Sequence, residues 1–110
     1  MSTQAFTPTG NTVTFTATTT TPPTPVQALS TTLGGNQYRI INAGVQTVFL
    51  GIGSTASGAT ANAAVVTSSG LSIPLLAGTD EILTFTTNAY FTGLTSTSTS
   101  VVYITPGDGQ

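Results

Sequence analysis

The sequence predicts an all-β fold: an antiparallel, jelly-roll-like β-sandwich of about eight short strands, preceded by an extended N-terminal arm rich in Thr and Pro. Short runs that alternate apolar with polar residues recur along the chain, and this period of two is typical of half-buried strands. Clusters of Gly, Pro, Asn and Ser separate the runs at regular spacing, as in sandwiches and small barrels. No stretch has convincing helical periodicity, so we expect no helix.

The first 25 residues differ in composition from the rest of the chain. Residues 13–17 alternate Val, Phe and Ala with Thr, as in a half-buried strand. Three prolines, which cannot donate to a sheet ladder, then follow within four residues: Pro22, Pro23 and Pro25. Two interpretations remain open: a solvated linker, or an extended arm, with or without a short strand of its own, that packs Phe6 and Phe15 on a neighbouring subunit. We assign residues 1–25 to this arm or linker and residues 26–110 to the sandwich domain.

The densest run of large apolar residues lies within Tyr38–Gly53. We predict that it forms a β-hairpin about Asn42–Gly44, because Asn and Gly tolerate the left-handed backbone of a tight reversal. In its second half, Val48, Phe49 and Leu50 place apolar groups on both faces of the strand. This pattern indicates a central strand, or a strand whose outer face meets another chain.

The elements after this hairpin are predicted from their turn residues and periodicity. Residues 51–58 (GIGSTASG) are expected to be a connecting loop, because they lack the Lys and the following helix of a phosphate-binding loop. Residues 60–67 could form a helical turn, but their β-branched residues favour a strand. Pro74 places the strand at 71–75 at a sheet edge or a bulge. Further strands are predicted at 26–30, 80–86, 88–94 and 101–105.

The chain is unusually poor in charge. Charged residues make up 4% of its 110 residues, against roughly 25% in ordinary soluble proteins. A free monomer with so few charges lacks the repulsion that keeps proteins apart, so we expect a partner to cover part of the surface. One Arg and no Lys cannot neutralise a phosphate backbone, so we expect no nucleic-acid partner. No apolar run approaches the roughly 18 residues of a membrane helix, so we expect no membrane partner.

The residues needed for catalysis or metal binding are scarce. The chain has no Cys and no His, which excludes thiolate and imidazole metal sites. Asp80 and Glu81 are adjacent, so in a strand they point to opposite faces and cannot share a proton or a metal ion. Asp108 is the remaining acid, and we expect it in a terminal turn. Without an ordinary general base or activated nucleophile we expect no enzyme, no cofactor and no metal.

Arg39 is the only basic side chain and has two open interpretations. It could pair across strands with Asp80 or Glu81 and fix the register, or it could pair with a carboxylate on a partner. Three tyrosines could stack on a sugar, but aromatic residues in strands more often form core or subunit contacts. These are Tyr38, Tyr90 and Tyr103.

From Arg39 onward, four motifs follow one another in an order that resembles a group of small tailed-phage structural proteins of similar length. The motifs are RIINAG, VFLGIG, IPLLAGTDE and VVYITPGDG. In that group an Arg-x-x-Asn-x-Gly hairpin, an apolar F-x-x-x-G strand, a Pro-then-Gly-then-acidic segment and a closing Y-x-T-P-G-acidic-G tail recur in this order. The resemblance covers the last two thirds of the chain and leaves out the Thr/Pro-rich first third.

The resemblance implies a capsid decoration or cement protein. Such a protein lies on the outer capsid surface of the virion, bridges major capsid protein subunits, and works as a homo-oligomer, either a trimer or a dimer. Two alternatives remain: a phage tail, neck or head-fibre component of similar fold, and a carbohydrate-binding or adhesin module. The residues predicted to contact a partner are Phe6, Phe15, Pro22, Pro23, Pro25, Arg39, Val48, Phe49, Leu50, Tyr90 and Phe91.

Overall fold

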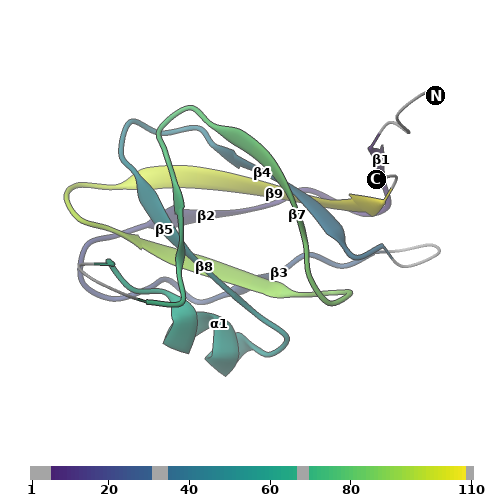
Figure 1. The fold of residues 1–110 in the computed structure, drawn as a ribbon, viewed down its shortest axis with the longest axis horizontal. Coiled ribbons are helices and arrows are strands. Elements are labelled where there is room, and N and C mark those ends of the chain that lie inside the picture. Colours follow the sequence, from purple (N-terminus) through teal and green to yellow (C-terminus); the bar gives the residue numbers. More distant parts are fainter. Residues whose placement is uncertain (1–5, 31–34, 67–69, 109–110) are drawn as a thin grey trace.

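The computed structural model describes residues 6–30, 35–66 and 70–108. Within these residues the chain forms two antiparallel β-sheets packed face to face, with a short helix on the outside (Figure 1). The first sheet has five strands and the second has four. The predicted all-β sandwich is therefore confirmed.

The two sheets divide the strands as follows. The first sheet contains β1 (Thr7–Pro8), β2 (Val13–Ala17), β4 (Gln37–Asn42), β7 (Asp80–Thr84) and β9 (Ser100–Asp108). The second sheet contains β3 (Val26–Gln27), β5 (Val48–Gly53), β6 (Ile73–Leu75) and β8 (Tyr90–Thr95). In the first sheet β9 lies between β4 and the N-terminal strands, and β7 forms the other edge. In the second sheet the order is β3, β8, β5, β6, so Pro74 lies on an edge strand as predicted.

The strand pairing follows a nested order. β2 pairs with β9, β3 with β8, β4 with β7, and β5 with β6. The first four of these strands therefore pair in reverse order with the last four, and successive pairs alternate between the two sheets. This is one long antiparallel hairpin rolled around a core, which is the jelly-roll arrangement.

The first strands belong to this roll, and the predicted boundary at residue 25 is wrong for them. β2 pairs with β9 from Val13 opposite Ile104 to Ala17 opposite Ser100. Phe15 is only 5% exposed, because its side chain lies on the inner face of the first sheet. Burial of this side chain in the chain's own core replaces the predicted contact with a neighbouring subunit.

The Thr/Pro-rich segment after β2 carries the chain from the first sheet to the second. The backbone oxygen of Thr18 accepts a hydrogen bond from the Thr95 amide at 2.9 Å. The hydroxyl of Thr92 donates to the Pro23 carbonyl at 2.7 Å. Both contacts attach the segment to β8, and its prolines are half-buried. The segment is therefore anchored on the sandwich by these contacts and its half-buried prolines, while the threonines between them, at 19–21 and 24, are exposed.

The predicted hairpin within Tyr38–Gly53 is also wrong, because β4 and β5 belong to different sheets. The link between them is fixed by the buried side chain of Asn42. Its amide nitrogen donates to the carbonyls of Gln46 at 2.7 Å and Leu75 at 2.9 Å. Its oxygen accepts from the Gly44 amide at 3.2 Å and the Ser100 hydroxyl at 2.7 Å. All four hydrogen-bonding positions of the side chain are satisfied, and the chain turns from one sheet to the other.

A short helix replaces the predicted loop and strand after β5. Helix α1 (Ala56–Asn62) begins where the hydroxyl of Thr55 accepts a hydrogen bond from the Gly58 amide at 3.0 Å, an N-cap. The predicted strand at 60–67 is not formed over residues 60–66, and Thr67 lies outside the described residues. Val65 and Val66, whose β-branched side chains favoured a strand, come after the helix has ended and do not disturb it.

The helix lies against the outer face of β5 because that face carries glycine. A Cβ on Gly51 would approach the Ala59 carbonyl oxygen to 2.4 Å, and one on Gly53 would approach the Ala59 amide nitrogen to the same distance. Such contacts are too short for a real side chain. The two glycines therefore allow the helix backbone to approach the strand closely, and Ala59 is completely buried there.

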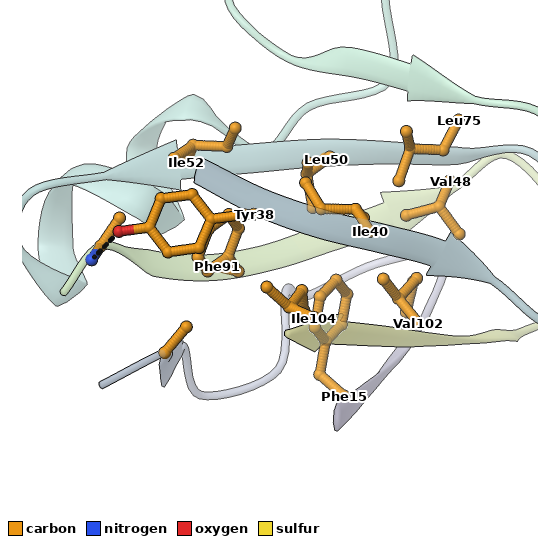
Figure 2. Close-up of a cluster of buried hydrophobic side chains, with 13 residues drawn as sticks. Phe15, Tyr38, Ile40, Val48, Leu50, Ile52, Leu75, Phe91, Val102 and Ile104 are labelled. Carbon is orange, nitrogen blue, oxygen red and sulfur yellow. Dashed lines mark hydrogen bonds between the residues drawn. The ribbon is translucent and has the colours of Figure 1, made fainter. Parts of the chain in front are cut away.

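The core lies between the sheets and is almost entirely apolar (Figure 2). Tyr38 from β4 packs edge to face on Phe91 from β8, with ring centroids 4.9 Å apart and an interplanar angle of 64°. The Tyr38 hydroxyl donates to the Thr86 carbonyl and accepts from the Ala89 amide at 3.0 Å. Burial raises the pKa of the Tyr38 phenol above its ordinary value. With these two hydrogen bonds, the hydroxyl of the buried Tyr38 side chain has partners for both its proton and a lone pair.

We predict that replacing Phe15 with Ala lowers the free energy of unfolding by about 3–5 kcal/mol, because the change leaves a cavity in the core. The matched control is Thr16→Ala on the same strand, where the side chain is exposed and the expected change is within about 0.5 kcal/mol. Urea unfolding of both variants measures the difference. Equal effects would show that β2 is not part of the packed sandwich.

Replacing Asn42 with Ala should lower the free energy of unfolding by about 3 kcal/mol, because buried groups in the β4–β5 link lose their hydrogen-bond partners. Asn36→Ala, one residue before β4, is the control because Asn36 is exposed. Thermal and urea unfolding report the change. A loss for Asn42→Ala no larger than that for Asn36→Ala would contradict the role of this amide.

Candidate functional site

The outer face of the first sheet carries the one basic side chain of the protein. Side chains alternate along a strand, so residues 39 and 41 of β4 point away from the core. Arg39 lies opposite Thr105 of β9 on one side and Ile82 of β7 on the other. The three side chains therefore form one row across the face.

Arg39 forms an ion pair with Asp80, its diagonal neighbour on β7. Nε of Arg39 donates to the two carboxylate oxygens at 3.0 and 3.1 Å, and Nη2 donates to Oδ2 at 2.5 Å. The carboxylate thus occupies the Nε–Nη2 edge of the guanidinium, and Nη1 has no partner among the described residues. The cross-strand interpretation of Arg39 is confirmed, with Asp80 as the partner. Glu81 points to the opposite face of the strand, as predicted for adjacent acids.

The pair changes the titration of both groups. Hydrogen bonds from Arg39 lower the pKa of the Asp80 carboxyl below its ordinary value, and the same contact raises the pKa of Arg39. The side chains are 49% and 43% exposed, so solvent weakens the attraction and the pair contributes little to stability. It does hold two opposite charges at fixed positions on an otherwise uncharged face.

A depression of about 450 Å³ surrounds this pair. Its polar groups are Arg39, Asp80 and Thr105, and the Thr105 hydroxyl lies 2.7 Å from that of Thr12. Its apolar walls are Phe6, Pro8 and Ile82. Pro8 belongs to β1 beside β9, Phe6 immediately precedes β1, and Ile82 comes from β7 at the far edge of the sheet. The depression therefore spans the width of the first sheet.

The structure brings two of the predicted contact residues together here, Phe6 and Arg39. The sequence analysis missed Pro8, Ile82 and Thr105, because their proximity depends on strand register across β1, β9, β4 and β7. Alternation within β7 and β9 places Ile82 and Thr105 on one face. It does not identify the strand that lies beside them.

Four predicted contact residues are buried in the chain's own core, so the prediction that they touch a partner is wrong. They are Phe15, Val48, Leu50 and Phe91. β5 is a central strand between β8 and β6, which confirms the first interpretation of its apolar run. Phe49 lies opposite Leu94 and Pro74, on the outer face of the second sheet, and is half-buried. Contact of the remaining residues with a partner stays a prediction: Phe6, Pro22, Pro23, Pro25, Arg39, Phe49 and Tyr90.

The tyrosines considered for sugar stacking differ in exposure. Tyr38 is completely buried and cannot meet a ligand. Tyr90 is half-buried at the start of β8. Tyr103 is 42% exposed on the outer face of the first sheet, where it lies opposite Ile41 of β4 and Thr14 of β2.

Comparisons with protein-family models, with curated proteins and with solved structures give no match for this chain. Over residues 6–30, 35–66 and 70–108, no group of three or more His, Cys, Asp or Glu side chains is placed to hold a metal ion. The described part of the chain contains no helix of the length and apolarity needed to span a membrane. We take the depression around Arg39 and Asp80 as the candidate site.

The Arg39–Asp80 pair predicts a pH dependence of stability. Because the folded pKa of Asp80 lies below its unfolded value of about 4, the pair stabilises the fold above that unfolded value. This stabilisation is lost as the pH falls through the folded pKa. The difference in unfolding free energy between the native chain and Arg39→Gln should be small but measurable at neutral pH and should vanish in strong acid. Asp80→Asn should behave in the same way, and a difference that does not change with pH would contradict the assignment.

Proposed function

We propose that this chain is a non-enzymatic structural protein of a phage virion that decorates the outer capsid surface and bridges major capsid protein subunits. The order of motifs from Arg39 onward supports this proposal, and so does the jelly-roll arrangement, which viral capsid domains and lectins share. A fold alone does not set a function. Support for a function therefore comes from the exposure and charge of the surface residues.

One end of the sandwich presents large apolar side chains without charge, and this observation carries the proposal. Two backbone hydrogen bonds join the β4–β5 and β6–β7 links there. The backbone N–H of Asn42 donates to the Thr79 carbonyl at 3.0 Å, and the backbone N–H of Gly78 donates to the Asn42 backbone carbonyl at 2.9 Å. Val45 in the first link is 81% exposed, and Leu76 in the second is 63% exposed. We call residues 43–47 and 76–79 the end surface.

The end surface has the composition of a protein contact. Its sequences, AGVQT and LAGT, contain no charged residue, and depletion of charge is what distinguishes the centre of an interface from ordinary surface. The links are also held by backbone hydrogen bonds, so little ordering is needed on binding. Many copies on one lattice would turn a modest contact into firm attachment.

The low charge of the whole chain fits the same proposal. A virion protein functions in the bound state. Symmetric contacts between its copies replace the charge repulsion that keeps free proteins apart in solution. We include a homo-oligomer, either a dimer or a trimer, in the proposal for this reason.

The test is co-sedimentation of the purified chain with capsids of the phage that encodes it, prepared without this protein. We expect saturable binding, and we expect the double variant Val45→Ser/Leu76→Ser to bind at least about tenfold more weakly, as removal of central apolar contacts commonly does. The matched control is Leu71→Ser, because Leu71 is 79% exposed but lies outside the end surface. Its binding should be unchanged.

Cryo-electron microscopy of the complete virion separates the proposal from its alternatives. Density for the sandwich on the capsid shell, with the end surface toward the major capsid protein, is the expected result. Density confined to the tail, neck or head fibre would overturn the capsid assignment. Equal binding by the double variant and the control would overturn the role of the end surface.

A further inference from the structure

The depression on the outer face of the first sheet combines two kinds of surface. Its polar lining consists of the paired charges of Arg39 and Asp80 together with Thr105. Its walls are the apolar side chains of Phe6 and Ile82, with Pro8 next to Phe6. A volume of about 450 Å³ falls in the range of small-molecule sites, roughly 300–1,000 Å³.

The charges of the site select against an ionic ligand. An anion that reached the guanidinium of Arg39 would come close to the carboxylate of Asp80, which lies 2.5–3.1 Å from the same group. A cation that reached Asp80 would meet Arg39 in the same way. A neutral ligand that both accepts and donates hydrogen bonds satisfies the two groups without this conflict.

We propose that this depression binds a neutral saccharide, with the Arg39–Asp80 pair hydrogen-bonded to neighbouring sugar hydroxyls. A hydroxyl group can accept from the guanidinium and donate to the carboxylate, so two adjacent hydroxyls match the pair. The C–H surfaces of a pyranose ring match the apolar walls. Both properties are needed, since the lining of the depression contains polar and apolar side chains.

The free edge of the guanidinium supplies the donors. Asp80 occupies Nε and Nη2, and Nη1 has no partner among the described residues. Nη1 can therefore donate to a sugar oxygen without breaking the ion pair. The pair also holds the guanidinium in one orientation before the ligand arrives, which lowers the entropic cost of binding.

Thr105 also lines the depression, and its hydroxyl contacts that of Thr12 beyond β9. The two hydroxyls lie 2.7 Å apart and hydrogen-bond to each other. Each hydroxyl has one proton and two lone pairs, so the pair retains unused capacity for a further ligand hydroxyl. This capacity continues the polar row from Asp80 and Arg39 toward the N-terminal strands.

The inference is independent of the capsid proposal, because it concerns a site on the isolated chain. The depression is open to solvent, with both charged side chains nearly half exposed. We therefore expect a dissociation constant of about 1 mM for a single site. Many copies on one particle would raise the effective affinity for a glycan-bearing surface.

The test is a titration of the full chain, labelled with ¹⁵N, with neutral methyl glycosides of glucose, galactose and mannose, followed by nuclear magnetic resonance. We expect concentration-dependent shifts of the Arg39 side-chain Nε–H and of the backbone amides of Asp80, Ile82 and Thr105. Asp80→Asn should weaken binding by about tenfold, because it removes a charged acceptor. The matched control is Glu81→Gln, which removes the same charge from the next residue, on the opposite face of β7, and should leave binding unchanged.

Other results would overturn the inference. Absence of shifts at these positions with all three glycosides would do so, as would equal weakening in Asp80→Asn and Glu81→Gln. Tighter binding of inorganic sulfate than of the glycosides, with the same shifts, would identify an anion site instead. The spectra also report folding, so a variant that loses its structure would be recognised, and Ile82→Ala, which trims an apolar wall without touching the charges, would replace it.

Discussion

The fold depends on the buried side chain of Asn42, which holds the point where the chain crosses from one sheet to the other. A jelly roll needs such crossings, because its successive strand pairs alternate between sheets. A crossing exposes backbone groups that no ladder pairs, and burying them without partners costs about 1–3 kcal/mol each. Asn42 supplies two donors and accepts two hydrogen bonds, so it serves two carbonyls, one amide and one hydroxyl at once. The approach of Gly44 to Ser100 completes the crossing, since a Cβ on Gly44 would lie 1.8 Å from the Ser100 hydroxyl.

The strands could be predicted from the sequence, but their partners could not. Alternation in β4 and β5 identifies the buried residues Tyr38, Ile40, Val48 and Leu50. It does not tell whether two consecutive strands lie side by side in one sheet or face each other across a core. Asn, Ala and Gly at 42–44 favour a tight turn locally, whereas long-range hydrogen bonds to Leu75 and Ser100 decide the observed crossing. The same limit explains the N-terminal strands, whose place beside β9 is set by pairing with the other end of the chain.

In the candidate site, the sequence limited the possible contacts only for the charged residues, because there are so few of them. Because acids are scarce, a cross-strand pair of Arg39 with Asp80 or Glu81 was one of two interpretations of the sequence, and the structure selects Asp80. Helix α1 was missed because small residues such as Ala59 carry no strong periodic signal, while the glycines that receive the helix lie on another element. Apolar character alone also failed to separate core from interface. Phe15 and Phe91 were assigned to a partner surface, and both pack inside their own sandwich.

The scarcity of charge changes how the two proposed surfaces relate to each other. Only one face of the described chain carries a cation, and its charge is compensated by Asp80 at the same place. The end surface carries no charge, so a contact there buries apolar groups without the desolvation cost of an ion. The end surface lies on the links between strands, whereas the depression lies on the flat face of the first sheet. Asp80, which lines the depression, directly follows Thr79 of the end surface, so the two proposed surfaces adjoin each other. A partner bound at the end surface would therefore lie next to the depression, and the two proposed contacts would be neighbours on the same molecule.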